Sequence, residues 1–392
     1  MATICSSASP LEEHWYCVGM RRRKMCLALL GALVLTACAE GARSTKLPSQ
    51  GVAGSASGAT STAPAMLRAA SAEIKLPSGF QASVYAEGLQ SPTSMAWGPD
   101  GKLYITQLSG GENAGMGQVV VVGSPGARPR RVLNGFAKPT GLVWREQDLY
   151  IVAGRNVLRA SRLADGEIDV PIVVVRDLPF NTRSEGQIDL LPDGRLVFEA
   201  SGDVRDPGSG RLLTLLPGDQ PEVLATGLKN AYAYAVDPQS GRVFTTDIAD
   251  DRMNGDMPPE EINLVEPGAD YGWPRCYGDQ EPAMDRGGSL SDCAKTQTPV
   301  VTFPVGTTPA GLGFHDGALW VALWNGEPPQ VARVTLVEST KGLSGNVATF
   351  MTGVGRPIDV LPEPSGALLV LDFQSGVVYR VYRKAGKPNI IR

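Results

Sequence analysis

The sequence predicts an all-β protein, a six-bladed β-propeller of four-stranded blades, and a repeated turn phrase is the main evidence for it. The phrase is a turn that contains Asp or Gly, followed by a short run of β-forming residues. Six copies are spaced about 46 residues apart, with one longer interval before the fifth. Such a repeat is typical of a propeller; a β-sandwich or two small β domains are the weaker alternatives. The copies are GPDGKLYIT (98–106), REQDLYIVA (145–153), LPDGRLVFE (191–199), DPQSGRVFTTD (237–247), HDGALWVAL (315–323) and EPSGALLVLD (363–372).

A second phrase precedes the first and leads into the strand expected to line the central channel. Its copies are GLQSP (88–92), GFAKP (135–139), GLKNA (227–231) and GVGRP (353–357). One further strand, FQASVYAEGL (80–89), comes before the first unit, and the last unit ends near Arg383. We therefore expect the N-terminal strand to complete the last blade and close the ring, which leaves fewer open sheet edges.

Composition agrees with this fold and limits the function. The 392 residues are 43% hydrophobic and 19% charged, with 46 Gly and 30 Pro, which suits short strands and tight turns. The net charge of −4 gives no case for nucleic acid as a partner. Histidine is scarce: His14 lies before the expected fold and His315 lies in a turn, so no arrangement of a nucleophile with its base is visible.

The N-terminal residues 1–38 are expected to be a lipoprotein signal peptide, with Met20 as the true start. A basic patch is followed by a short apolar run and by LTAC, which resembles a bacterial lipobox ending at Cys38. The run is shorter than the ~20 residues that cross a bilayer, which disfavours a membrane-spanning anchor. Lipidation of Cys38, followed by Ala39, predicts attachment to the periplasmic face of the outer membrane, the lipid being the only membrane contact.

The remaining chain divides into a tether and a folded body. Residues 39–72 are rich in small and polar types and predict a disordered tether, and residues 73–388 predict the propeller. The body keeps two cysteines, Cys276 and Cys293, and these are expected to pair in an oxidising compartment. A metal-binding pair or a catalytic thiol is the less favoured alternative.

Basic residues gather on the loops that lead into the inner strands. These loops are expected to meet at one mouth of the channel, where converging cations would favour a small anionic ligand. The alternative is that these long basic side chains bind no ligand and only expose their charges to solvent at the rim of the channel. The residues are Lys138, Lys229 with Asn230, Arg356, and Arg183 at the matching place before the third blade.

An acidic, Gly- and Pro-rich stretch, residues 246–263, contains oxygen ligands of the kind that Ca²⁺ prefers. Its spacing does not match an EF-hand, and a solvated acidic loop is an equal alternative.

Several stretches together resemble the glucose/sorbosone dehydrogenase family. They are GLKNAYAYAVDPQSGRVFTTD (227–247), PPEEINLVEPGADYGWPRCYGD (258–279) with Cys293, and GRPIDVLPEPSGALLVLDFQSGVVYRV (355–381). The resemblance covers about residues 79–385 and implies an exported six-bladed propeller. It also implies pyrroloquinoline quinone and Ca²⁺ as cofactors, and the oxidation of a sugar, aldehyde or polyol by hydride transfer to the quinone.

The resemblance also assigns residues to roles. It places the quinone against Lys229 and Asn230, and the other basic residues expected at the mouth, Arg183, Arg356 and Lys138, are expected to contact it as well. The resemblance also implies that Ca²⁺ binds near Ile248, Ala249 and Asp250, partly through backbone carbonyls. The family's general-base histidine corresponds to Arg183, and an arginine cannot accept a proton.

Three functions stay open after this substitution. The first is a quinone-dependent sugar or sorbosone dehydrogenase that uses another base, with Glu185 and Asp189 as candidates. The second is a non-catalytic propeller that binds a ligand or a protein. The third is a metal-dependent lactonase-type hydrolase in which Asp189, Asn230 and Asp359 meet in the channel.

Overall fold

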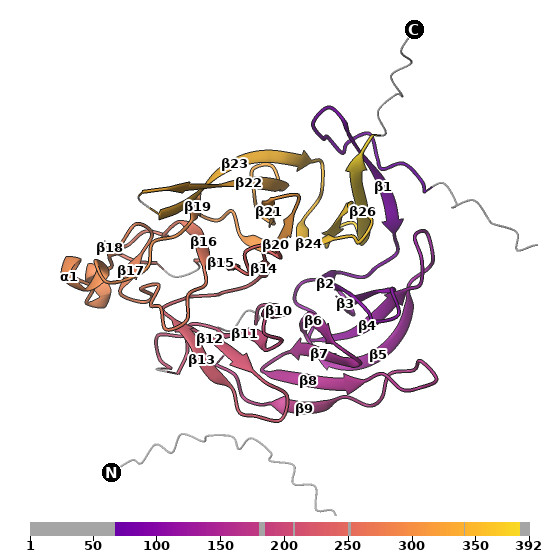
Figure 1. Ribbon diagram of the computed structural model, residues 1–392, viewed down its shortest axis with the longest axis horizontal. Helices are drawn as coiled ribbons and strands as arrows, with labels where there is room; N and C mark the ends of the chain where they lie inside the picture. The colour runs from indigo at the N-terminus through magenta and orange to yellow at the C-terminus, as the bar shows by residue number, and fades with distance from the viewer. Residues whose placement is uncertain (1–66, 180–184, 207, 250–251, 341, 385–392) are drawn as a thin grey trace, which may run out of the picture. The chain divides into compact units, whose positions relative to one another are not determined.

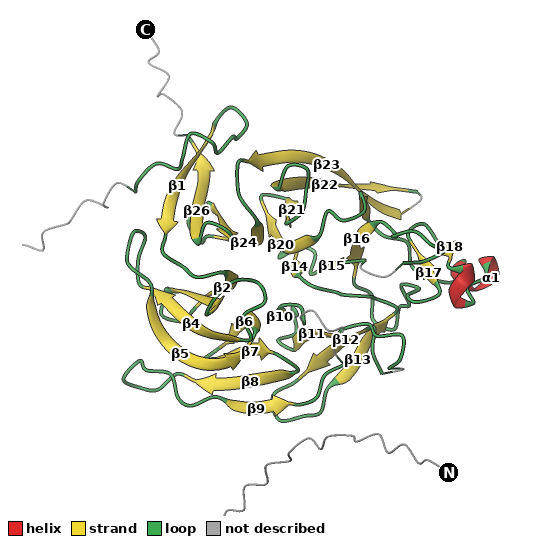
Figure 2. Ribbon diagram, turned by 180° about the vertical axis from the view of Figure 1, so that it is seen from behind, coloured by secondary structure: helices red, strands yellow, loops and turns green. Residues whose placement is uncertain are grey.

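The computed structural model describes residues 67–179, 185–206, 208–249, 252–340 and 342–384. Two compact units divide the chain, and the second, Thr62–Arg392, contains all of the described residues. These residues form six four-stranded antiparallel sheets that follow one another around a central axis (Figures 1 and 2). The predicted six-bladed propeller is confirmed.

The first three blades follow the chain in order, each from the inner strand outward. Blade 1 contains β2 (Pro92–Trp97), β3 (Leu103–Leu108), β4 (Met116–Val122) and β5 (Arg130–Ala137). Blade 2 contains β6 (Pro139–Arg145), β7 (Asp148–Ala153), β8 (Asn156–Ser161) and β9 (Ile172–Val175). Blade 3 contains β10 (Ile188–Leu190), β11 (Leu196–Ala200), β12 (Arg211–Leu215) and β13 (Glu222–Thr226).

The last three blades include one long insert and the closure of the ring. Blade 4 contains β14 (Tyr234–Val236), β15 (Val243–Asp247), β16 (Glu260–Leu264) and β19 (Val301–Phe303). Blade 5 contains β20 (Pro309–His315), β21 (Ala318–Leu323), β22 (Gln330–Ser339) and β23 (Gly342–Thr352). Blade 6 contains β24 (Pro357–Pro362), β25 (Leu368–Asp372), β26 (Val377–Arg383) and β1 (Phe80–Ala86).

The turn phrases explain why the strands begin and end where they do. All six copies lie at the turn between the first and second strands of a blade. The second strands are uninterrupted apolar runs such as ALWVAL in β21, whose six residues are all buried. A strand has such an uninterrupted apolar sequence when it has partner strands on both edges and other residues cover both of its faces.

The ring closes as the sequence predicts. β1 pairs antiparallel with β26, from Phe80 opposite Arg383 to Ala86 opposite Val378. Of the expected tether, the structure describes residues 67–72, and Ala69 forms a bridge with Ser83 of β1. The expected signal peptide, including Cys38, lies outside the described residues.

The insert between β16 and β19 accounts for the long interval in the repeat. It contains β17 (Cys276–Tyr277), β18 (Glu281–Pro282), a 3-10 turn η1 (Met284–Arg286) and α1 (Leu290–Cys293). A disulfide joins Cys276 to Cys293, with the two Cα atoms 5.5 Å apart. Across the described part of the chain, no helix is long and apolar enough to cross a membrane.

Neighbouring inner strands approach each other closely where glycine removes a side chain. A Cβ built on Gly141 of β6 would lie 2.6 Å from the Cα of Gln187 in the next blade. Nearby, the hydroxyl of Thr140 donates to the carbonyl oxygen of Gly186 at 3.1 Å. Glycine therefore sets how tightly blades 2 and 3 meet around the channel.

We expect Gly141→Ala to lower the free energy of unfolding by about 1–3 kcal/mol, because the added methyl group forces backbone apart in a packed core. Gly123→Ala is the matched control, since a Cβ there meets nothing within 4 Å. Urea unfolding of both variants tests this prediction. Equal midpoints for the two variants would show that blades 2 and 3 can separate without cost.

Candidate functional site

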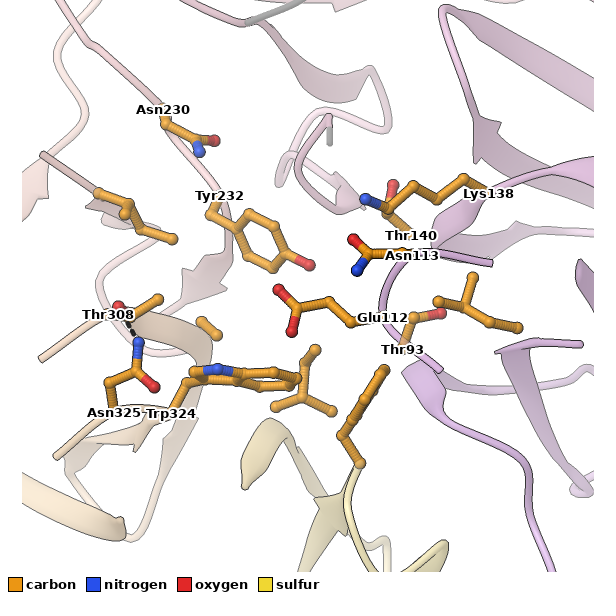
Figure 3. Close-up of a pocket in the computed structure, with 15 residues that line it drawn as sticks. Thr93, Glu112, Asn113, Lys138, Thr140, Asn230, Tyr232, Thr308, Trp324 and Asn325 are labelled. Carbon is orange, nitrogen blue, oxygen red and sulfur yellow. Dashed lines mark hydrogen bonds between the residues drawn. The ribbon is translucent and has the colours of Figure 1, made fainter. Parts of the chain in front are cut away.

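A cavity of about 400 Å³ opens at the end of the propeller where the inner strands begin, and we call it the mouth cavity. Its wall combines aromatic rings, amides, hydroxyls, one ammonium group and one carboxylate (Figure 3). A pocket of this size with a few convergent polar groups is typical of a small-molecule site. The lining residues are Thr93, Leu108, Glu112, Asn113, Lys138, Thr140, Asn230, Tyr232, Ile248, Thr308, Ala310, Trp324, Asn325, Ile358 and Phe373.

The backbone at this mouth is strained in a repeated way. Ser91, Lys138 and Thr308 each precede the proline that begins an inner strand, and their φ angles are 44°, 38° and 55°. Non-glycine residues adopt this left-handed region at a cost, and the surrounding structure must hold them there. The strain fixes the direction in which each loop enters the channel.

Carboxylates at the ends of second strands hold two further entry loops, those of blades 4 and 6. Asp247, the last residue of β15, accepts the backbone N–H of Lys229 at 3.0 Å and that of Asn230 at 2.6 Å. Asp372, the last residue of β25, accepts the N–H of Arg356 at 2.8 Å. The same device therefore positions two loops that the sequence marks as basic.

Lys138 lies at the mouth as predicted. It lines the cavity, and burial lowers the pKa of its ammonium group while the nearby Glu112 raises it (Figure 3). Arg356 lies beside the rim, with its guanidinium 5.2 Å from the centre of the Trp324 ring and its Nη1 3.2 Å from Glu112 Oε2. Two of the predicted cations thus border one cavity.

Lys229 does not line the mouth cavity. Its Nζ donates to the carbonyl oxygen of Gly202 and lies 5.5 Å from the Trp273 ring, on the side of the insert. The predicted convergence of four cations is wrong in this respect, because Trp273, far along the chain, offers the Lys229 side chain a buried place away from the channel. Arg183 lies outside the described residues.

Asn230 lines the mouth cavity, and its side-chain amide can hydrogen-bond the buried carboxylate of Glu199. With its nitrogen turned toward Glu199, it donates to Oε1 at 2.8 Å. Glu199 also accepts the N–H of Gly186 at 2.6 Å.

Glu185, one of the two candidate bases, is only 2% exposed and does not line the mouth cavity. Burial, and then the charge of Glu199, hold the pKa of Glu185 well above its usual value.

Asp189, the other candidate base, lies in a different cavity. This inner cavity, of about 200 Å³, is lined by residues further along the inner strands, including Asp189 and Asp359. Burial raises the pKa of Asp189 to about 6 and that of Asp359 to about 7. Asn230 lines the mouth instead, so the structure does not bring together the three residues of the lactonase hypothesis.

The expected calcium site is only partly described. Ile248 lines the mouth cavity, and the N–H of the next residue, Ala249, donates to Glu260 Oε2 at 3.0 Å. Asp250 lies outside the described residues. Within the described ranges, no three His, Cys, Asp or Glu side chains are grouped so as to hold a metal ion.

Sequence reasoning missed most of the residues that line the mouth cavity, among them Glu112, Tyr232 and Trp324. Glu112 lies on the loop between β3 and β4, which neither repeated phrase includes. Trp324 follows β21, and its ring packs edge-on against Phe373, with the ring centres 4.7 Å apart. One feature of the sequence could have identified Trp324. It lies immediately after the second strand of its blade, and the second strands end at the mouth.

Comparison with known proteins agrees with the geometry. Residues 214–380 match the sequence model of the family Glucose / Sorbosone dehydrogenase. An uncharacterized protein of Borreliella burgdorferi is 20% identical over 355 residues, covering 79% of this chain and 90% of its own length.

Two solved structures share the fold. The putative oxidoreductase (glucose dehydrogenase) of Thermus thermophilus is 24% identical, with a TM-score of 0.63, and the match covers 78% of this chain and 100% of that one. The holo form of the pyranose dehydrogenase PQQ domain from Coprinopsis cinerea is 17% identical, with a TM-score of 0.65, and the match covers 79% and 97%. The resemblance to the glucose/sorbosone dehydrogenase family is thus confirmed, by sequence over residues 214–380 and by the six-bladed fold of the described chain.

Proposed function

We propose that the protein is a quinone-dependent dehydrogenase that oxidises an aldose, an aldehyde or a polyol in the mouth cavity. The observation that supports this most directly is the lining of the cavity. A flat indole, Trp324, faces amides and hydroxyls such as Asn113 and Thr140, with Lys138 at the rim (Figure 3). Aromatic faces bind the apolar faces of sugar rings, and amides and hydroxyls bind their hydroxyl groups.

The same lining suits pyrroloquinoline quinone, a planar molecule with three carboxylates. The cavity of about 400 Å³ is large enough for it, and Trp324 and Phe373 offer flat apolar surface. Lys138 and Arg356 would hold its carboxylates, because both are cations at or beside the rim. When bound, the quinone supplies a two-electron acceptor for hydride.

The protein's own residues would bind and orient the reactants. Asn230 and Thr308 lie on the neighbouring entry loops of blades 4 and 5, and both line the cavity where they can hydrogen-bond a ligand. The carboxylate of Asp247 keeps the Asn230 loop in place. Ca²⁺, if it binds, would lie near the backbone of Ile248 and Ala249. Fixed donors of this kind reduce the entropy lost when reactants are brought together.

A binding propeller without catalysis is the second candidate, and one observation favours it. No histidine is among the described residues of the mouth cavity, and His315 lines a separate cavity with Trp320 and other residues of blades 5 and 6. Binding of quinone or sugar without turnover would select this function.

Calorimetry with pyrroloquinoline quinone and Ca²⁺, followed by a dye-reduction assay with aldoses and sorbosone-like aldehydes, tests the proposal. We expect saturable binding and reduction of the dye. If neither binding heat nor a thermal shift is observed, the quinone is excluded as the cofactor. If the quinone binds but no substrate of the panel leads to dye reduction, the non-catalytic binding propeller is the remaining function.

Lys138→Met is expected to weaken quinone binding about tenfold, because it removes a partly buried cation that faces an anionic ligand. Lys102→Met is the matched control: Lys102 forms its ion pair with Asp100 on another part of blade 1, 2.9 Å away. Calorimetric dissociation constants for both variants decide the point. Unchanged affinity in Lys138→Met would place the quinone carboxylates elsewhere.

We also propose that the protein is exported and anchored by a lipid on Cys38 at the periplasmic face of the outer membrane. The lipobox-like LTAC sequence supports this. Labelling of cells with a fatty-acid analogue should mark the wild type and not Cys38→Ser, and membrane fractions should retain only the wild type. Labelling of the serine variant would disprove lipidation at this residue.

A further inference from the structure

Glu112 has an unusual place in the mouth cavity. Among the described residues that line the cavity, it is the only one with a carboxylate. Figure 3 shows the carboxylate pointing into the cavity, toward the hydroxyl end of Tyr232 and the Trp324 ring. We propose that Glu112 is the catalytic base that takes the hydroxyl proton of the substrate, an inference that rests on the proposed dehydrogenase function.

The neighbours of Glu112 hold its carboxylate in position. Arg356 Nη1 lies 3.2 Å from its Oε2, and the Arg356 guanidinium lies over Trp324. The Arg356 backbone is itself held by Asp372. Lys138 is the second cation near Glu112, and Tyr232 is the other titratable neighbour. Two cations therefore border the Glu112 carboxylate and hold it at the edge of the cavity.

Other groups at the mouth are poorly suited to this role. Lys138 is a donor when protonated, and burial holds the pKa of the Tyr232 hydroxyl far above neutral, so it stays protonated. Glu185 is closed off behind the wall and Asp189 lines the inner cavity. Arg183, at the position of the family's histidine, cannot accept a proton. By elimination among the described residues, the proton goes to Glu112.

The proposed step is balanced. As the carbon–hydrogen bond of a hydroxyl-bearing carbon breaks, hydride passes to an ortho-quinone oxidant, and the O–H proton passes to the Glu112 carboxylate. The carbon–oxygen bond becomes a carbonyl; the substrate loses two electrons and the quinone gains them. The Glu112 side chain is 60% exposed, so the proton can then leave to solvent.

Glu112→Gln is the central test, because glutamine keeps the size and the contact with Arg356 but cannot act as the base. With pyrroloquinoline quinone, Ca²⁺ and glucose, we expect kcat to fall at least 100-fold, consistent with the loss of a general base. The dissociation constant of the quinone should change less than threefold, and the acidic limb of the kcat–pH profile should disappear. Glu112→Asp should restore part of the rate.

Glu87→Gln is the matched control, since Glu87 forms an ion pair with Arg68 and its side chain has a similar exposure of 61%. A second measurement does not depend on turnover. Carbodiimide labelling read by mass spectrometry should show that bound glucose protects Glu112 and leaves the labelling of Glu87 unchanged.

The outcomes separate this inference from the proposed function. If the wild type turns over and Glu112→Gln keeps more than half of its kcat, the base assignment is wrong and the dehydrogenase stands. If Glu112→Gln loses quinone affinity in proportion to rate, Glu112 is a binding residue and not the base. If the wild type binds quinone but oxidises nothing, both proposals fail together, whereas protection of Glu112 by glucose would still identify the sugar site.

Discussion

Replacing both Cys276 and Cys293 with serine is expected to lower the free energy of unfolding by about 3 kcal/mol. The two residues are separated by 17 positions, and both are buried, at 3% and 0% exposure. Without the cross-link, the unfolded chain gains conformational entropy, which accounts for most of the expected loss. Urea unfolding monitored by tryptophan fluorescence measures it.

The insert that this disulfide closes also packs against blade 3. A Cβ on Gly202 or Gly210 would lie 2.9 or 2.6 Å from the Trp273 ring, so the indole fits closely against both glycines. We therefore expect the double serine variant to lose structure first around Trp273 and Lys229. Reduction of the wild type with dithiothreitol should reproduce the effect, and an unchanged unfolding midpoint in both samples would contradict it.

The second large effect is a fall in stability as the pH rises from about 4.5 to 8. Burial raises the pKa of Glu261 to about 8 and those of Glu260 and Asp359 to about 7, and it also raises that of Glu199. Across this range the folded state binds more protons than the unfolded state, so its stability falls with increasing pH. At about 1.4 kcal/mol per pKa unit, the largest of these shifts alone corresponds to a few kcal/mol. Denaturant midpoints measured at pH 5 and pH 8 test the direction and size.

Glu199→Gln should reduce this pH dependence, because the amide cannot ionise and Asn230 can turn its oxygen toward it. Glu222→Gln is the control, since Glu222 is exposed on β13. If the protein is instead more stable at pH 8 than at pH 5, these acids are ionised in the folded state. Groups outside the described residues would then have to stabilise their charges.

Local sequence signals determined most of the architecture. A turn with Asp or Gly followed by an apolar run reports the first and second strands of a blade, since both features depend on residues adjacent in the chain. Closure by residues 80–86 followed from the position of one unmatched strand. The entry loops were found for the same reason, so Lys138 and Asn230 were correctly expected at the mouth.

The direction and surroundings of individual side chains were decided only by the tertiary structure. Lys229 leaves the mouth because Trp273, 44 positions later, provides it with a ring and a buried place. Glu112 reaches the mouth because the loop between β3 and β4 forms part of the cavity wall. A repeat fixes the backbone path of each blade, but a side chain's partners come from distant segments. The sequence by itself therefore determined the scaffold and the position of the mouth, and the packing between blades determined which charges face the ligand.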